Sequence, residues 1–292
     1  MTKPRNTKPM ASFSGSGGGN KDDFADTGEF DTRRTHVFDR APDGALVPVP
    51  RVTAPLEKQI PTVPPREMAV RTQIEAFREL RTRLLTMGAG LGRAHFNVLV
   101  VPIANDAGAS FVARNLAAAF ALQERGSAVL IDCDFRNPTQ GEVLNPAANG
   151  SGLSDYLDQA MFVNYQQPVV LERLLQRTAI PNLHLIPAGR CEAMRAGRPR
   201  EYFSSSAMRL LVDAIRGERE TCTIVLDGPA LDSSPDARIL SALADMVVMV
   251  VAYGQKSHED VLKAAESFDR AKFAGVVFND RGAGARAAPR RR

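Results

Sequence analysis

Short, almost wholly apolar runs alternate with amphipathic segments over most of the chain after residue 90. Apolar runs of this kind are typical of strands buried on both faces of a parallel sheet. The predicted strands are 97–103, 128–132, 183–187, 222–227, 246–251 and 274–278, and the predicted intervening helices are 110–124, 205–219, 235–244 and 257–271.

The alternation of strands and helices predicts the fold class. Parallel strands joined by right-handed crossovers form a doubly wound α/β sheet, mostly parallel, with helices on both faces. Another helix is expected before the first strand, because Ile74, Phe77, Leu80 and Leu84 recur at helical spacing. We therefore expect order to begin near Glu67.

The first 66 residues lack this periodicity. They contain a Gly/Ser stretch at 15–19, mixed charges and repeated prolines, which are typical of a disordered leader. The sequence therefore predicts one folded domain over 67–280, a disordered leader at 1–66 and a disordered basic tail at 281–292.

Composition and charge change this picture at few points. No run approaches the roughly 18 to 20 apolar residues that span a bilayer, and the N-terminus lacks the apolar core of a signal peptide. Three cysteines without metal-ligand spacing favour a reducing cytoplasm. The net charge of +4 comes from the tail, since 281–292 holds five arginines and no acid. Such a tail is either solvated or binds an anionic surface such as lipid.

The segment after the first predicted strand resembles a phosphate-binding loop. It reads Ala-Asn-Asp-Ala-Gly-Ala-Ser over 104–110 and leads into a helix, as such a loop requires. A working P-loop would place a lysine, which holds the β and γ phosphates, where Ala109 stands between Gly108 and Ser110. The sequence therefore predicts a nucleotide-binding scaffold that lacks its main cation.

Aspartates end two other predicted strands. Asp132 and Asp134 end or follow one strand, and Asp227 ends another. Because the carboxyl ends of parallel strands meet at one edge of the sheet, we expect these carboxylates near the loop, where they suit a Mg²⁺ that bridges phosphates. Each aspartate taken alone is at least as well explained as a helix cap or turn former.

Together these motifs resemble those of the bacterial tyrosine kinases (BY-kinases) of capsule and exopolysaccharide synthesis, themselves relatives of the partition and division-site ATPases. Val-Leu-Ile-Asp-Cys-Asp-Phe-Arg-Asn-Pro at 129–138 resembles the family's second Walker A-type motif, and Ile-Val-Leu-Asp-Gly-Pro at 224–229 resembles its Walker B strand. Glu75, Arg78 and Arg81 match the E-x-x-R-x-x-R helix through which family members pack into a ring. Without that match, the same three residues would be explained by ion pairing along one helix.

The resemblance implies a P-loop NTPase-like fold and a site for ATP or ADP with Mg²⁺. The implied nucleotide-binding positions are Asp106, Gly108, Ala109, Ser110 and Phe111. Ser110, Asp132 and Asp227 would hold the metal, and Asp132 and Asp134 would be catalytic if the protein is active. The implied partners are an inner-membrane polysaccharide co-polymerase and further copies of the chain in a ring-type homo-oligomer; no nucleic-acid partner is expected.

The chain also departs from the family pattern. Ala109 replaces the loop lysine, Asp106 replaces a loop glycine, and no tyrosine lies beyond 279, where family kinases carry a tyrosine cluster. Both loop changes oppose nucleotide binding, because one removes a cation and the other adds a negative charge. A substitute cation could come from Arg114, although its position favours a solvated helix residue. It could also come from Arg78 or Arg81 of a neighbouring copy in a ring.

Three functions are consistent with these observations. The first is a kinase-like regulator of exopolysaccharide or capsule biosynthesis and export, with impaired catalysis (a pseudokinase), at the inner face of the cell membrane beside a chain-length protein. The second is an active tyrosine autokinase or ATPase with an unusual phosphate-binding loop. The third is a partition-type positioning ATPase that uses the arginine tail. The second Walker A-type motif and the E-x-x-R-x-x-R helix favour the first two.

Overall fold

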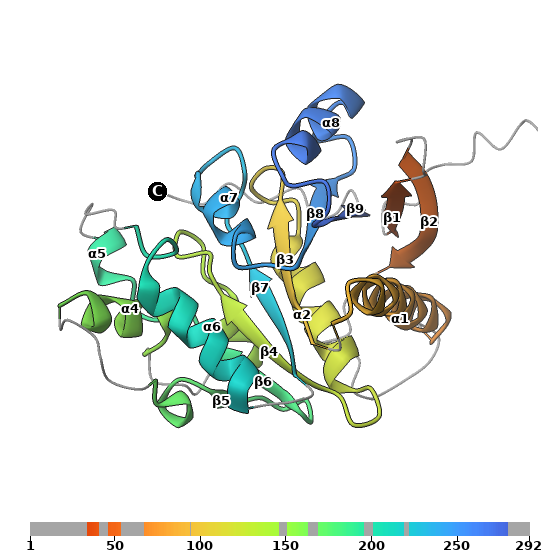
Figure 1. Ribbon diagram of the computed structural model, residues 1–292. Helices are drawn as coiled ribbons and strands as arrows, with labels where there is room; N and C mark the ends of the chain where they lie inside the picture. Colours follow the sequence, from red (N-terminus) through yellow and green to blue (C-terminus); the bar gives the residue numbers. More distant parts are fainter. Residues whose placement is uncertain are drawn as a thin grey trace, which may run out of the picture. The chain divides into compact units, whose positions relative to one another are not determined.

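The computed structural model describes residues 34–40, 46–53, 67–93, 95–145, 151–162, 169–195, 201–218 and 222–279. All of them belong to one compact unit, Thr32–Arg292 (Figure 1). Most of the leader and the whole basic tail at 281–292 lie outside the described residues.

The described residues form one nine-stranded sheet with the order β2-β1-β9-β8-β3-β7-β4-β6-β5. Six neighbouring strands pair in parallel. They are β3 (Asn97–Pro102), β4 (Ser127–Asp132), β6 (Leu183–Ile186), β7 (Cys222–Asp227), β8 (Met246–Ala252) and β9 (Phe273–Asn279). The doubly wound, mostly parallel α/β fold is therefore confirmed.

Helices cover both faces of this sheet. They are α1 (Glu67–Gly90), α2 (Ala109–Ala121), α3 (Gln140–Leu144), α4 (Leu153–Phe162), α5 (Glu192–Arg195), α6 (Ser206–Glu218), α7 (Asp236–Ser241) and α8 (His258–Glu266), with a 3-10 turn, η2, at Leu171–Arg173. Successive residues of β3 belong to two different apolar clusters, one on each face of the sheet. Val98 and Val100 join the apolar cluster that contains α1 and α2, whereas Leu99 and Val101 join the one that contains α4, α6, α7 and α8. The uniformly apolar strands follow from this double coverage.

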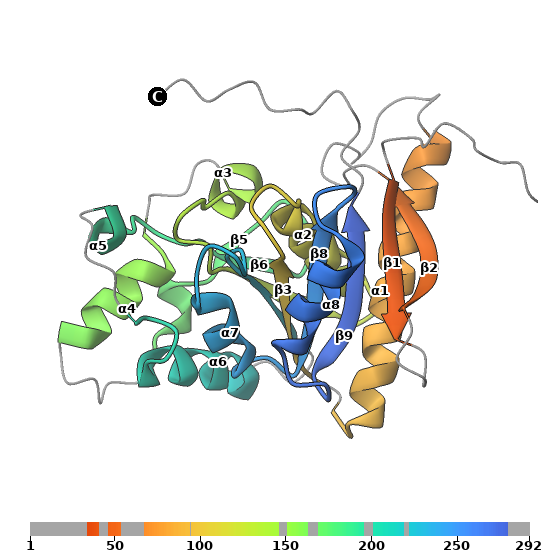
Figure 2. The same cartoon turned by 90° about the horizontal axis from the view of Figure 1, so that it is seen from above.

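The structure corrects the prediction for two parts of the leader. β1 (Arg34–Arg40) and β2 (Leu46–Thr53) form an antiparallel hairpin, and β1 pairs with β9 (Figure 2). The prediction of disorder over 1–66 is therefore wrong for these strands, because the open edge of β9 supplies hydrogen-bond partners that no local pattern reveals. Pro48 and Pro50 lie on β2, which pairs with no strand other than β1 in the described part of the chain, and such edge strands tolerate proline.

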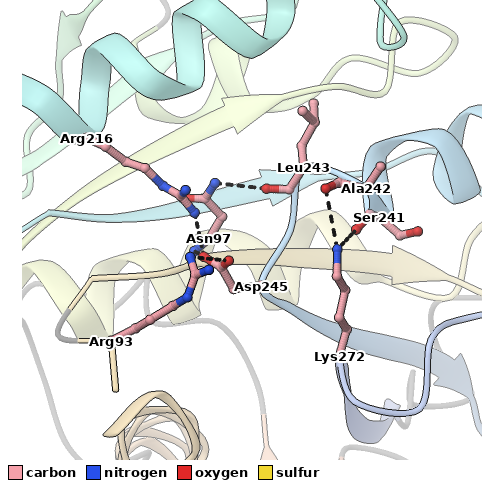
Figure 3. Close-up of polar contacts among 8 residues, drawn as sticks. All are labelled: Arg93, Asn97, Arg216, Ser241, Ala242, Leu243, Asp245 and Lys272. Carbon is pink, nitrogen blue, oxygen red and sulfur yellow. Dashed lines mark hydrogen bonds and ion pairs between the residues drawn. The ribbon is translucent and has the colours of Figure 1, made fainter. Parts of the chain in front are cut away.

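The amino ends of the central strands are joined by a cluster of ion pairs (Figure 3). Asp245 Oδ1 accepts a hydrogen bond from Arg93 Nη1 at 2.8 Å, and its Oδ2 accepts from Arg216 Nη2 at 2.5 Å and from the Asn97 amide at 2.8 Å. Arg216 also donates through Nε to the Asn97 side chain. We call Arg93, Asn97, Arg216 and Asp245 the amino-edge cluster.

The short β5 (Gln176–Arg177) pairs antiparallel with β6 and ends the sheet on that side. Among the described helices, none combines the length and the hydrophobicity that crossing a bilayer requires.

Candidate functional site

The turn between β3 and α2 has the backbone of a phosphate-binding loop. β3 ends at Pro102 and α2 begins at Ala109. Gly108, at the helix N-cap, has φ 86° and ψ 23°, a left-handed conformation that glycine adopts at little cost. Asp106 also has a positive φ of 63°, which aspartate tolerates better than most residues. The loop conformation therefore survives the replacement of a loop glycine by Asp106.

Two side chains from distant elements hold this loop in place. Asn279 Nδ2, at the end of β9, donates to the Ala107 carbonyl at 2.9 Å, and Gln255 Nε2, after β8, donates to the Asn105 carbonyl at 2.7 Å. The sequence pattern predicted neither residue. Asn279 could have been found, because a polar residue at the carboxyl end of a strand faces the binding edge of such a sheet; nothing in the pattern distinguishes Gln255.

The loop places no cation at the position of the missing lysine. Ala109 is 4% exposed and belongs to the apolar cluster beneath α2. Phe111 packs edge to face against Phe77 of α1, with ring centroids 6.0 Å apart, which gives its ring a packing role. Ser110 is half-buried, and its hydroxyl bonds to Asp227 closely enough to lower the pKa of that carboxyl.

Asp132 and Asp227 lie opposite each other on β4 and β7 and are 1% and 0% exposed. Asp132 closes the turn that follows β4. Its Oδ1 accepts from the Asp134 amide at 3.2 Å, and its Oδ2 accepts from the Thr139 and Gln140 amides at 3.1 Å. Turn formation, the alternative left open for each aspartate, therefore describes the hydrogen bonds of Asp132.

Asp134 shapes the same turn. Its Oδ1 accepts from the amides of Arg136 and Asn137 at 3.2 and 3.1 Å. Burial raises the pKa of this carboxyl, and the two backbone hydrogen bonds oppose that shift. The structure thus places the predicted catalytic pair, Asp132 and Asp134, at the expected edge, with both carboxylates engaged by backbone amides.

Gln140, the first residue of α3, joins the loop to the carboxylates. Its side chain is fully buried, and Nε2 donates to Asp227 Oδ2 at 2.6 Å and to the Ser110 carbonyl at 2.9 Å. Its Oε1 accepts from Arg114 Nη1 at 2.8 Å. We call Arg114, Asp132, Gln140 and Asp227 the carboxyl-edge network.

Two residues of this network differ from the sequence prediction. Arg114 is 7% exposed, so the prediction of a solvated helix residue is wrong: the guanidinium is drawn inward by Gln140 and by the charges of Asp132 and Asp227. Gln140 was missed, because a single glutamine after a turn has no distinguishing pattern.

The carboxyl-edge network raises the pKa values of its acids. Burial is the main cause for Asp132, whose pKa lies well above its usual range, and the neighbouring charge of Asp227 adds to the shift. Burial likewise raises the pKa of Asp227 to about 7, against the opposing effects of hydrogen bonds from Gln140 and Ser110 and of the charge of Arg114. The two acids are therefore costly to ionise together.

The carboxyl-edge network does not fit a magnesium ion as it stands. Both oxygens of Asp132 accept hydrogen bonds from backbone amides, and Asp227 Oδ2 accepts one from Gln140. Asp227 Oδ1 is therefore the one oxygen of the two carboxylates without a hydrogen-bond partner. Among the described residues, no group of three or more His, Cys, Asp or Glu side chains could hold a metal. The start of α2 is better suited to an anion, since its first turn has no side-chain cap and no acid.

The residues predicted to assemble a ring are divided between two roles. Glu75 and Arg78 form an exposed ion pair at 2.9 Å on α1. Arg81 instead donates from Nη1 to the Ala119 carbonyl in the last turn of α2, at 2.9 Å, where a cation complements the helix dipole. Assembly through these residues stays a prediction.

Comparison with curated proteins identifies relatives of this chain. The chain is 30% identical over 210 residues to the tyrosine-protein kinase Wzc of Salmonella typhimurium, an alignment that covers 70% of this chain and 26% of the relative. It is 28% identical over 211 residues to the succinoglycan biosynthesis transport protein ExoP of Rhizobium meliloti, covering 71% and 25%. It is 23% identical over 207 residues to the tyrosine-protein kinase CpsD of Streptococcus agalactiae, covering 70% and 82%. The chain thus spans about a quarter of the length of the first two relatives.

Solved structures share the fold. The kinase domain of the Escherichia coli tyrosine kinase ETK superposes with a TM-score of 0.60 at 21% identity, covering 74% of this chain and 79% of that one. The chimerical protein CapA2B2 gives a TM-score of 0.58 at 24% identity, covering 76% and 88%. A scan against protein-family models gave no match.

Proposed function

Because this chain belongs to the family of bacterial tyrosine kinases, we propose that it is a kinase-like regulator of exopolysaccharide or capsule biosynthesis and export that does not transfer phosphoryl groups. The relatives support the pathway, since one is named for succinoglycan biosynthesis transport and others are tyrosine kinases.

The buried alanine at position 109 carries the proposed loss of catalysis. A lysine there would contribute a charge-assisted hydrogen bond of about 1.5 to 3 kcal/mol, and each 1.36 kcal/mol of lost transition-state stabilisation is about a tenfold loss in rate. Phosphoryl transfer depends on such positive charge because negative charge spreads over the transferred group.

Nucleotide binding is proposed through backbone groups. The uncapped first turn of α2 offers N–H groups to ATP or ADP phosphates, in the positions expected from Gly108 to Phe111. Asp106 opposes this with its negative charge, so we expect weak binding. Ser110, Asp132 and Asp227 do not fit Mg²⁺ in this arrangement, because backbone amides and Gln140 engage three of the four carboxylate oxygens.

We propose an inner-membrane polysaccharide co-polymerase as the partner and a peripheral position on the cytoplasmic face of that membrane. The exposed Glu75–Arg78 pair on α1 is available for contact with a second copy in a ring. The arginine tail at 281–292 would add attraction to anionic lipid.

Purified protein and a deletion strain test the two halves of this proposal. Wild type and an Ala109→Lys variant are compared for ATP hydrolysis, phosphotyrosine and ADP binding by calorimetry; we expect an inactive wild type that binds nucleotide weakly. Deletion of the gene should change the amount or chain length of the exopolysaccharide, and wild type and Ala109→Lys should both restore it. Hydrolysis or phosphotyrosine in wild type would refute the loss of catalysis, and an unchanged polysaccharide would refute the pathway.

One observation favours an active enzyme instead. The Arg114 guanidinium is buried beside the two carboxylates, where it could replace the missing lysine. In that case wild type hydrolyses ATP and Arg114→Met abolishes the activity, whereas Ala109→Lys is not needed for it.

A further inference from the structure

The carboxyl-edge network contains two buried carboxylates together with a guanidinium whose positive charge compensates them. We propose that Arg114 and Gln140 together replace the lysine and divalent cation of a former nucleotide site, so that the domain reaches full stability with neither metal nor nucleotide bound. The proposal deepens the proposed function and rests on it for the identity of the site.

The first support is the charge balance. Two carboxylates on adjacent strands, Asp132 and Asp227, are removed from water, and burying them without a nearby cation is costly. Arg114 is the cation whose charge acts on both. It reaches Asp227 through the neutral amide of Gln140, since Gln140 accepts from the guanidinium and donates to the carboxylate.

The second support is that the donors and the acceptor of the Gln140 side chain all have hydrogen-bond partners. A glutamine side chain has two N–H donors and one carbonyl acceptor. Nε2 donates to Asp227 and to the Ser110 carbonyl, and Oε1 accepts from Arg114. A fully buried side chain with donors and acceptor all engaged is held in one orientation, so the amide acts as a fixed bridge between the loop and β7.

The third support is that Asp132 fixes the backbone from which this bridge projects. Asp132 Oδ2 accepts from the Gln140 amide, while the Gln140 side chain donates to Asp227. Each carboxylate is thus tied to the same residue, one through its backbone and one through its side chain. A cation could approach Asp132 or Asp227 Oδ2 only by displacing these hydrogen bonds.

Thermal unfolding of the full chain tests the proposal, with MgCl₂ alone, ADP alone, both together, and EDTA as conditions. The variants are Gln140→Ala and, as a matched control, Gln159→Ala, an exposed glutamine on α4. We expect wild type to unfold at the same temperature in EDTA and in MgCl₂. Gln140→Ala should unfold about 3 to 6 °C lower in EDTA and recover part of that loss in MgCl₂, because Asp227 Oδ2 loses its hydrogen bond and both oxygens of that carboxylate become open to the cation. Gln159→Ala should match wild type throughout.

Wild type that MgCl₂ stabilises by several degrees would overturn the proposal, and so would a Gln140→Ala protein that is as stable as Gln159→Ala. If Gln140→Ala does not fold, the wild-type comparison still decides, together with calorimetry of MgCl₂ binding, where measurable binding would count against it. ATP hydrolysis by wild type would refute the proposed loss of catalysis but would not change the stability results. Failure of the proposed function and failure of this inference are therefore distinguishable.

Discussion

The acids at the two edges of the central sheet differ in how fully nearby cations compensate their charge. In the amino-edge cluster, one carboxylate, Asp245, receives two guanidinium groups and a backbone amide, and its side chain is 12% exposed (Figure 3). In the carboxyl-edge network, two fully buried carboxylates share one guanidinium, and a neutral glutamine stands between.

The difference separates a cluster of well-compensated charges from a cluster that is costly to charge. At the amino edge, two guanidinium groups and a backbone amide compensate one carboxylate. These contacts stabilise the packing of β3, β8 and α6 against one another. The carboxyl edge keeps acids with raised pKa values, at the edge where doubly wound sheets bind ligands. Such costly groupings are expected at sites shaped by chemistry rather than by folding.

Replacing Asp227 by asparagine should have the largest effect, and it should be stabilising. Folding raises the pKa of Asp227 from an unfolded value near 4 to about 7, so the folded protein still holds a proton that the unfolded chain has released. The resulting stability is complete below about pH 4 and is lost as the pH rises toward and through 7. Asp227→Asn should therefore gain up to about 4 kcal/mol at pH 8 and flatten the pH profile of urea unfolding. A profile that is unchanged by the substitution would contradict this.

Removing the guanidinium of the carboxyl-edge network should come next. Arg114→Met keeps much of the apolar stem but takes away the cation that faces Asp132 and Asp227, which should destabilise the protein by about 3 kcal/mol. Because the acids then ionise less readily, the loss should grow between pH 5 and pH 8. Equal losses at both pH values would show that Arg114 acts only through packing.

Asp245→Asn should destabilise, in contrast with the same change at Asp227. It removes the partner of Arg93 and Arg216, and the loss should be about 1 to 2 kcal/mol because both guanidiniums are partly solvated. Urea unfolding at pH 7 measures both asparagine variants side by side. Two changes of the same sign would remove the distinction between the edges.

The smallest effect on stability is expected at α1, away from both edges. Glu75→Ala with Arg78→Ala should change the free energy of unfolding by less than about 0.5 kcal/mol, since the pair is exposed. Sedimentation should nevertheless show loss of the ring if this pair joins copies of the chain. An unchanged oligomer would remove Glu75 and Arg78 from the assembly surface.

The parallel sheet could be predicted from the sequence because each buried strand carries its own apolar pattern. The order of strands could not be predicted in the same way. The β1–β2 hairpin was missed because it is held by the pairing of β1 with β9, which lies far away in the chain. Residue type also sufficed to find the loop and the three aspartates.

What the residue types could not predict was how the polar atoms are used. Asp132 and Asp134 accept backbone amides, and Arg114 is buried because Gln140 turns toward it. Such hydrogen bonds depend on the conformation of the turn between β4 and α3. The partners of the two aspartates lie within that turn and the partner of Arg114 lies at the start of α3, and residue types alone do not say which of these atoms meet.

The pairing of β1 with β9 has a consequence for the order of folding. Thr35 lies opposite Asn279, so this pairing joins residues near the two ends of the described chain. Contacts of such high sequence separation must wait for the intervening chain to be organised, because loop closure costs entropy before the contact repays it. Until then, β9 presents open hydrogen-bonding groups to other chains. The interval before β1 docks should therefore be the period in which newly made protein is most prone to aggregate, and hydrogen exchange should be faster in β1 and β2 than in β3.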